Sequence, residues 1–311
     1  MLFPPRVRRV ATLLALLFAA AAAAPPALGA AVRPLPRGDA PITPLTSAEV
    51  AAFAPYTHFA STAYCSPDTT RTWTCGANCD ANPTFEPVAS GGDGAITQFW
   101  YVGFDPALGE VIVGHQGTDI EAIIPVLTDA DIVLTPLSPT LFPGVGLDVL
   151  VHNGFEGTHA RSAPLVLKAV TSALQQFGAT KVTVVGHSLG AAISLLDTVF
   201  LPLHLPSNVT TRFVGYGLPR VGNKAFANLV DGLGESVTHI GNMEDIVPVI
   251  PPIAFGFHQP TGEIHIMDNG QWVSCPGQDN PSPECAFASA NVLHFNVSDH
   301  DGPYDGIEIG C

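Results

Sequence analysis

Positively charged residues are scarce in this chain of 311 residues, which has 12 lysines and arginines against 27 aspartates and glutamates. A formal net charge of -15 disfavours binding to nucleic acid or to an anionic lipid surface, because both are negatively charged themselves. Charged residues of both signs together make up only 13% of the sequence, whereas 47% is hydrophobic. This composition predicts a chain with a sizeable core and with uncharged partners.

Long apolar runs are missing beyond the N-terminus. Three arginines among the first nine residues precede an uninterrupted apolar stretch, Leu13–Ala24, and prolines and small residues follow it. This order is typical of a secretory signal peptide, and the stretch is too short to span a bilayer. We therefore expect residues 1–30 to be a signal peptide of a secreted, extracellular protein without a transmembrane segment. Their removal would change the formal net charge from -15 to -18, and residues 31–44 would form a Pro-rich segment or a short pro-piece.

Internal repeats and linker-like stretches are also missing from the rest of the chain, so residues 45–311 are expected to form one catalytic domain. Apolar positions at helical spacing predict a helix over 165–177 and another over 189–200, with a buried β-branched strand, 181–185, before the second. Strands that alternate with helices predict an α/β fold, in which a largely parallel central sheet is flanked by helices. A further hairpin is expected over 253–267.

No cysteine is left over, because the chain has six, and in an exported protein this number predicts three disulfides. Sequence alone allows fifteen pairings. Short separations suggest Cys75–Cys79 and Cys275–Cys285, which leave Cys65–Cys311. No pair of cysteines or histidines has the spacing of a zinc finger, so neither a metal nor a cofactor is expected.

Two triplets match the signal for N-linked glycosylation. They are Asn208-Val-Thr210 and Asn296-Val-Ser298. In a secreted protein, Asn208 and Asn296 are therefore candidate sites for a glycan on a surface loop.

The motif Gly186-His187-Ser188-Leu189-Gly190 has the form G-x-S-x-G. It lies between the predicted β-branched strand and an amphipathic helix, where a nucleophile elbow is found. The turn is tight, so its flanking glycines avoid clashes, and Ser188 projects at the carboxyl end of the strand. We predict that Ser188 is a nucleophile. The competing interpretation is a serine in an ordinary turn between strand and helix.

A serine hydroxyl needs a base, and the base needs an acid that orients it. The elbow fold predicts the chain order serine, acid, histidine. Among the later histidines, His300 lies in a loop near the C-terminus, whereas His294 stands between Leu293 and Phe295 and fits packing better. We predict that His300 is the base.

The acid is predicted to be Asp245, which directly follows a predicted strand, as the acids of such sheets do. Glu244 is adjacent but fits a solvated turn. Asp197 lies too far along the predicted elbow helix to orient the base.

Five motifs resemble, in order, those of the class 3 lipases of fungi, and the resemblance extends over nearly all of Thr46–Cys311. It implies an α/β-hydrolase-like fold, the same triad and the same three disulfides. It also implies an oxyanion hole at the backbone N–H groups of Thr118 and Leu189, donors that would stabilise the negative charge of a tetrahedral intermediate. The motifs are Val113-Gly-His-Gln-Gly-Thr118, Val151-His-Asn-Gly-Phe155, Val185-Gly-His-Ser-Leu-Gly190, Tyr216-Gly-Leu-Pro-Arg-Val-Gly-Asn223 and Asp245-Ile-Val-Pro248.

The sequence departs from the family pattern twice. Gln116, preceded by His115, stands where the family usually has arginine, which raises the question of how the oxyanion loop is braced. Gly302-Pro303-Tyr304 replaces the usual aromatic pair after the base, which affects the shape of its loop. Neither change removes a reacting group.

A lid follows the oxyanion strand in the family, and the corresponding segment here is Asp119–Asp131. Pro125 would shorten or kink a helix in it, and the run Ile132–Val151 could line an acyl groove, although core packing explains an apolar run equally well. The residues able to form one apolar lid face are Ile120, Ile123, Ile124 and Leu127.

Taken together, these features predict a secreted, monomeric serine hydrolase of the lipase kind. It would cleave water-insoluble triacylglycerols at a lipid–water interface through an acyl-enzyme. A soluble carboxylesterase or feruloyl-type esterase of the same fold is the alternative, against which the apolar lid argues. A non-catalytic lipid-binding protein is disfavoured by the intact set of Ser188, Asp245 and His300.

Overall fold

A computed structural model describes residues 40–128, 132–233, 237–290 and 295–311. The predicted signal peptide and most of the predicted Pro-rich segment lie outside the described residues. The end of that segment belongs to the domain, because Thr43–Pro44 forms strand β1 and pairs antiparallel with β13 (Trp272–Cys275). No helix in the described part of the chain is long and apolar enough to cross a membrane.

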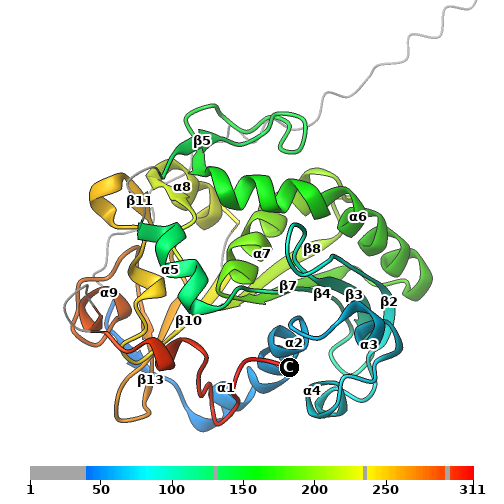
Figure 1. Cartoon of the computed structure of the whole chain (residues 1–311), viewed down its shortest axis with the longest axis horizontal. Helices are drawn as coiled ribbons and strands as arrows, with labels where there is room; N and C mark the ends of the chain where they lie inside the picture. The colour runs from blue at the N-terminus through cyan, green and yellow to red at the C-terminus, as the bar shows by residue number, and fades with distance from the viewer. Residues whose placement is uncertain (1–39, 129–131, 234–236, 291–294) are drawn as a thin grey trace, which may run out of the picture. The chain divides into compact units, whose positions relative to one another are not determined.

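The main sheet contains nine strands among the described residues. They are β1, β2 (Glu86–Gly91), β3 (Trp100–Asp105), β4 (Glu110–His115), β7 (Lys181–His187), β8 (Thr210–Tyr216), β10 (Val237–Asn242), β12 (Glu263–Ile266) and β13. Their order is β1-β13-β12-β10-β8-β7-β4-β3-β2 (Figure 1). The five strands from β12 to β4 run parallel, and antiparallel strands flank them on both sides. The predicted α/β fold with a largely parallel central sheet is confirmed.

Helices cover both faces of this sheet. The helices among the described residues are α1 (Ser47–Ala51), α2 (Ala54–Thr62), α3 (Pro67–Thr72), α4 (Ala77–Ala81), α5 (Ile120–Thr128), α6 (Asn153–Phe177), α7 (Leu189–Phe200), α8 (Lys224–Asp231) and α9 (Ala286–Ser289). Short 3-10 helices span Leu201–Leu203, Val247–Val249, Ile253–Phe255 and Val297–His300.

The core has two parts because successive side chains of a strand point to opposite faces. On β7, Val184 packs in the cluster that includes α6 and α7, whereas the next residue, Val185, packs in the cluster that includes α2. Figure 1 shows α6 and α7 on one side of the strands and α2 on the other. Because both faces of β7 are buried, its sequence contains a continuous run of β-branched residues instead of alternating apolar and polar ones.

The prediction of a hairpin over 253–267 is wrong. Phe257–His258 (β11) pairs with Gly222–Asn223 (β9) in a second, four-stranded sheet, which also contains β5 (Leu134–Pro136) and β6 (Leu150–His152). β12 instead joins the main sheet beside β10. The turn between β11 and β12 connects the two sheets, because β11 pairs with β9 and β12 pairs with β10.

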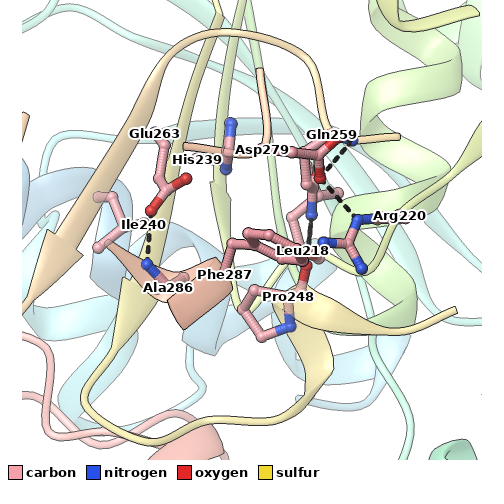
Figure 2. Close-up of a pocket in the computed structure, with 11 residues that line it drawn as sticks. Leu218, Arg220, His239, Ile240, Pro248, Gln259, Glu263, Asp279, Ala286 and Phe287 are labelled. Carbon is pink, nitrogen blue, oxygen red and sulfur yellow. Dashed lines mark hydrogen bonds and ion pairs between the residues drawn. The ribbon is translucent and has the colours of Figure 1, made fainter. Parts of the chain in front are cut away.

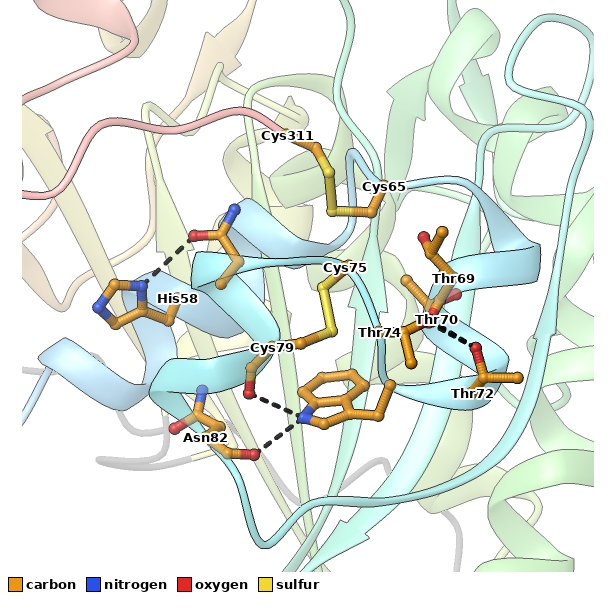
Figure 3. The surroundings of a disulfide bond; sticks show 12 residues. His58, Cys65, Thr69, Thr70, Thr72, Thr74, Cys75, Cys79, Asn82 and Cys311 are labelled. Atoms are coloured by element: carbon orange, nitrogen blue, oxygen red, sulfur yellow. Dashed lines mark hydrogen bonds between the residues drawn. A yellow bond between two sulfur atoms is a disulfide. The ribbon is translucent and has the colours of Figure 1, made fainter.

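Three disulfides join the same cysteines that the sequence separations suggested. Cys65–Cys311 spans 246 residues and connects the chain after α2 to its last residue. Cys75–Cys79 closes a short loop over Trp73, whose indole N–H donates to the carbonyls of Cys79 and Asn82 (Figure 3). Cys275–Cys285 closes the loop after β13.

Candidate active site

Ser188 stands at a sharp turn between β7 and α7. Its backbone has φ 56° and ψ -127°, a conformation that non-glycine residues rarely adopt and that costs energy. Glycine is needed on both sides, because a Cβ on Gly186 would collide with the backbone of Gly190, and one on Gly190 would collide with the carbonyl of His115. The strained serine and its two glycines are the geometry of a nucleophile elbow.

His300 and Asp245 form a hydrogen-bonded pair in the interior. His300 Nδ1 lies 2.9 Å from Asp245 Oδ2, and both side chains are fully buried. The second carboxylate oxygen accepts from the backbone N–H of Val247 at 2.9 Å. Because an ionised carboxylate only accepts, the Nδ1 proton of His300 is the donor, which leaves the Nε2 lone pair free to take a proton.

Ser188 Oγ and His300 Nε2 are among the buried side-chain polar atoms that have no hydrogen-bond partner within the described residues. These are the atoms that a serine–histidine pair uses. Catalytic hydrogen bonds are often loose in the absence of substrate, so an open pair is expected in the resting site. His294, the alternative base, lies outside the described residues.

Gly217 leaves room for the ring of His300, a role that was not anticipated from sequence. A Cβ at this position would lie 2.7 Å from His300 Cε1 and 3.2 Å from Asp245 Oδ2. Its φ of 52° also favours glycine. The Gly after Tyr216 in the motif is therefore required by the packing of the histidine–aspartate pair.

Thr118 and Leu189, the residues predicted to form an oxyanion hole, lie in the loop after β4 and at the start of α7. Leu189 is the first residue of α7, so its N–H is among the amides that have no partner within the helix. The Thr118 hydroxyl oxygen accepts from Gln98 Nε2 at 2.8 Å, which fixes that side chain.

Gln116 braces this loop in place of the family's arginine. Its backbone N–H donates to the carbonyl of Phe99, and its side-chain oxygen accepts from the N–H of Phe99, both at 2.9 Å. The side chain thus continues the pairing of β3 and β4 past the last residue of β4. The loop is therefore braced by Gln116, although the arginine usual in the family is missing.

A buried cluster anchors the end of β4 to the helices behind it. Asp197 on α7 lies 2.6 Å from His115 Nε2 and 2.8 Å from His159 Nε2, and all three side chains are fully buried. Burial by itself would raise the pKa of Asp197, but the charge of His159 and hydrogen bonds from both histidines lower it to about 2. Asp197 therefore does orient histidines, although not the predicted base.

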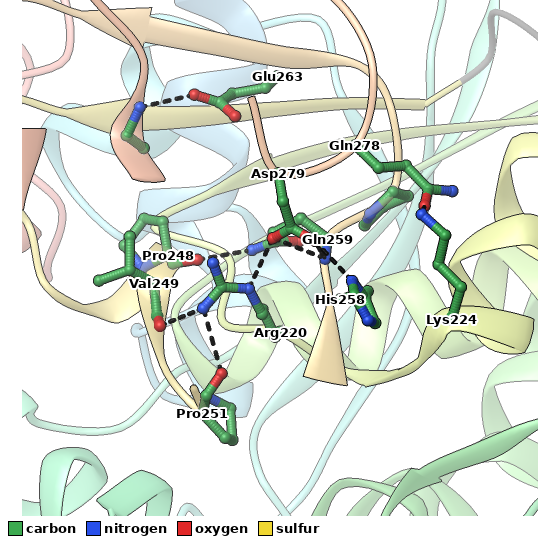
Figure 4. Close-up of polar contacts among 12 residues, drawn as sticks. Arg220, Lys224, Pro248, Val249, Pro251, His258, Gln259, Glu263, Gln278 and Asp279 are labelled. Carbon is green, nitrogen blue, oxygen red and sulfur yellow. Dashed lines mark hydrogen bonds and ion pairs between the residues drawn. The ribbon is translucent and has the colours of Figure 1, made fainter. Parts of the chain in front are cut away.

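The loop that carries Asp245 is clamped by a second polar network (Figure 4). The guanidinium of Arg220 bonds the carbonyls of Val249 and Pro251, and its Nε lies 2.8 Å from Asp279 Oδ1. Gln259 donates to the carbonyls of Leu218 and Pro248 at 2.7 and 3.1 Å. Sequence reasoning missed this network because its members come from four segments, although the Pro-Arg of the fourth motif marks one of them.

A small cavity of about 10 Å³ lies beside the network (Figure 2). Burial raises the pKa of Glu263 in its wall to about 7 and lowers the pKa of His239 to about 4. Glu263 also lies near Cys275 and Cys285, but both sulfurs belong to a disulfide and are not available to a metal ion.

Helix α5 packs its apolar side inward. Ile123 and Leu127 are buried in the larger core cluster, and Ile124 is partly buried against it. The side chain of Ile120 lies outside the described residues. Leu137 and Phe142 of the suggested acyl groove are also buried in this cluster, so these two side chains are core residues in this structure.

The two glycosylation candidates are both exposed. Asn208 lies in the turn before β8, at the edge of an apolar groove of about 200 Å³ lined in part by Leu174, Leu205 and Val209. Asn296 uses its side-chain oxygen to cap the short helix that contains His300, accepting from the N–H of Ser298.

Comparison with known proteins places this geometry among lipases. The family model for lipase (class 3) matches residues 112–255. A secreted mono- and diacylglycerol lipase of Malassezia globosa is 34% identical over 226 residues, which are 70% of this chain and 71% of that relative. Another lipase of the same description from that fungus is 29% identical, and the match spans 63% of its length.

Solved structures that are similar to this chain are also lipases. The triacylglyceride lipase of Rhizomucor miehei is 27% identical with a TM-score of 0.74, covering 86% of this chain and 98% of that one. A triacylglycerol lipase described as having a serine protease triad at its catalytic centre is 29% identical with a TM-score of 0.73 and the same coverage. The resemblance inferred from the five motifs is confirmed, and the chain belongs to the class 3 lipase family.

Proposed function

We propose that this protein is a secreted serine hydrolase that cleaves acylglycerol esters with the triad Ser188, His300 and Asp245. The observation that carries the proposal is the buried His300–Asp245 pair at 2.9 Å, whose free Nε2 accompanies an unpartnered Ser188 Oγ at a strained elbow. The relatives named above are described as secreted lipases, which supports both the activity and the extracellular location.

The reaction follows from these positions. His300 Nε2 takes the proton of Ser188 as Oγ attacks the ester carbonyl, and it then gives that proton to the departing alcohol oxygen. The acyl-enzyme is hydrolysed when His300 takes a proton from water, whose oxygen attacks the acyl carbon. Ser188 regains its proton as the fatty acid leaves. Asp245 stabilises the imidazolium that forms in each half of the reaction.

The oxyanion of both tetrahedral intermediates would be held by the N–H groups of Thr118 and Leu189. Fixed donors in a site closed to water stabilise this developing charge better than water does. The hydrogen bond from Gln98 to the Thr118 hydroxyl and the pairing of Gln116 with Phe99 fix the loop before substrate arrives.

Helix α5 is proposed to be a lid in its closed position. Ser188 and His300 are fully buried, so a bulky ester reaches them only if a covering segment moves. Ile123 and Leu127 on α5 would become exposed on opening, which costs less at an oil surface than in water. Phe255, Phe295 and Val297 are already exposed apolar residues that an interface would cover.

The number of acyl chains on the preferred substrate has two candidate answers. The solved lipase structures named above are triacylglycerol lipases, whereas the similar curated proteins are mono- and diacylglycerol lipases. We propose triacylglycerol as the main substrate, with partial glycerides as the second candidate on the basis of these curated relatives.

The test measures release of fatty acid from emulsified tri-, di- and monoacylglycerols, with a soluble butyrate ester and a feruloyl ester in parallel. Ser188→Ala and, as a matched serine control, Ser207→Ala are assayed alongside. We expect Ser188→Ala to lose activity on every substrate and Ser207→Ala to retain it. Activity confined to the soluble or feruloyl ester would contradict a lipase, and binding to emulsions without hydrolysis would favour a non-catalytic lipid-binding protein.

A further inference from the structure

His187, the residue before the proposed nucleophile, is buried and bonded on both ring nitrogens. Nδ1 lies 2.7 Å from the hydroxyl of Tyr64, and Nε2 lies 2.8 Å from the backbone carbonyl of His300. The rings of His187 and His300 are 4.3 Å apart between centroids. The proposed triad gives neither Tyr64 nor His187 a role.

The hydrogen bonds that connect Tyr64, His187 and the carbonyl of His300 each have a fixed direction. A backbone carbonyl only accepts, so Nε2 of His187 carries the proton that reaches His300. Burial, together with the charge of His300, lowers the pKa of His187, so its ring is neutral and Nδ1 is an acceptor. Tyr64 must then be the donor to Nδ1. Burial raises the pKa of Tyr64, so its hydroxyl keeps the proton that it donates.

Tyr64, at the other end of this series of hydrogen bonds, contacts the proposed oxyanion loop. The Tyr64 hydroxyl packs against the backbone of Gly117, where any Cβ would collide with it. Gly117 directly precedes Thr118. One path therefore runs from the oxyanion loop through Tyr64 and His187 to the backbone of the base.

A second tyrosine strengthens the same carbonyl. Tyr304 is fully buried, and its hydroxyl donates to the carbonyl of His300 at 3.0 Å. The carbonyl thus accepts two hydrogen bonds, one from His187 at the end of β7 and one from Tyr304 in the C-terminal segment. This explains how the unusual Gly302-Pro303-Tyr304 sequence still holds the loop of the base.

We propose that Tyr64 and His187 are positioning residues that hold His300 and the oxyanion loop in register with Ser188. His187 must remain neutral for this role, because a charged ring 4.3 Å from the imidazolium of His300 would oppose the proton transfer from Ser188. The inference rests on the proposed triad. It extends that triad by a series of hydrogen bonds that begins at Tyr64, a residue outside the five sequence motifs.

The test compares Tyr64→Phe with Tyr101→Phe. Both changes remove one buried hydroxyl, but Tyr101 donates to the carbonyl of Phe59, away from the triad. On p-nitrophenyl butyrate we expect kcat of Tyr64→Phe to fall roughly tenfold with KM within twofold of wild type, because reacting groups are displaced without loss of substrate contacts. Titration of Ser188 with a p-nitrophenyl phosphonate counts the folded sites. A kcat for Tyr64→Phe within twofold of wild type, or a loss equal to that of Tyr101→Phe, overturns the proposal.

His187 is tested by a conservative rescue. Glutamine keeps an N–H that reaches toward the His300 carbonyl, whereas leucine does not, so His187→Gln should retain at least threefold more kcat than His187→Leu. Equal kcat for these two variants contradicts the positioning role. Ser188→Ala distinguishes failure of the proposed triad from failure of the positioning role. If Ser188→Ala stays active, the proposed triad is wrong, whereas an inactive Ser188→Ala beside a fully active Tyr64→Phe contradicts only the positioning role of Tyr64 and His187.

Discussion

Gln116 and Phe99 hold each other by two hydrogen bonds of 2.9 Å, one through the backbone of Gln116 and one through its side chain. An amide side chain provides an acceptor that arginine lacks, so it can extend strand pairing toward the proposed oxyanion loop. The loop is thereby braced from β3, on the side of the site opposite to the proposed acid.

Replacing Gln116 by leucine should therefore slow the chemical step. We expect Gln116→Leu to lower kcat about tenfold with little change in KM, because the N–H of Thr118 would no longer be held where negative charge develops. Steady-state kinetics on a soluble ester measures this effect. Gln176→Leu, an exposed glutamine on α6, is the control and should behave as wild type. Equal rates for both variants would contradict the bracing role.

Asp197 should stabilise the fold in a pH-dependent way. Its pKa in the folded protein is about 2, below the ordinary 3.8, so the stabilisation is fully present above pH 3.8 and is lost as the pH falls through about 2. The shift corresponds to on the order of 2 kcal/mol of unfolding free energy. Asp197→Asn should lower the melting temperature at pH 7 and match wild type more closely as the pH approaches 2.

Thermal unfolding between pH 2 and pH 7 provides the measurement for Asp197. Asp68→Asn, which changes an exposed aspartate, serves as the control and should have little effect at any pH. A stability difference between Asp197→Asn and wild type that stays constant over this range would show that ionisation of Asp197 is not the cause.

Arg220→Lys should impair both stability and turnover. Lysine keeps the charge but loses the planar fork that bonds Asp279 together with the carbonyls of Val249 and Pro251. The loop after Asp245 would loosen, so we expect a lower melting temperature and a kcat reduced severalfold. Arg161→Lys, at an exposed arginine on α6, is the matched control. Unchanged kcat in Arg220→Lys would mean that the network supports the fold alone.

Leu127→Ser tests whether α5 closes the site. Loss of a fully buried leucine costs about 2–5 kcal/mol, which weakens the closed position of a lid more than it affects the rest of the fold. We expect hydrolysis of a soluble ester to rise severalfold relative to hydrolysis of an emulsion. Leu165→Ser, at an exposed leucine on α6, should leave this ratio unchanged. A general loss of stability without a change in the ratio would argue that α5 is fixed core.

Replacing the two exposed asparagines of the glycosylation signals should affect kcat differently. In a eukaryotic secretory host, Asn208→Gln and Asn296→Gln should each remove one glycan, which intact mass before and after endoglycosidase treatment detects. Asn208→Gln should leave kcat unchanged. Asn296→Gln should also lower kcat about twofold, because Asn296 caps the short helix that contains His300. No mass difference for either variant would contradict both predicted sites.

The local features followed from sequence because they depend on neighbouring residues. The β-branched run of β7, the glycines of the elbow and the helical spacing of α7 indicate the turn at Ser188 without any knowledge of the fold. The order of motifs, matched to a known family, then gave Asp245 and His300, which the tertiary structure pairs across 55 residues of sequence.

Tertiary structure alone decided which distant groups meet. Tyr64 and His187 are 123 residues apart, and His115 meets Asp197 across 82, so no local pattern announces either contact. The same holds for the rejected hairpin over 253–267, whose strands found partners in two different sheets. Sequence periodicity determines which face of a strand or helix is buried, whereas the packing of several elements determines which buried polar groups share hydrogen bonds.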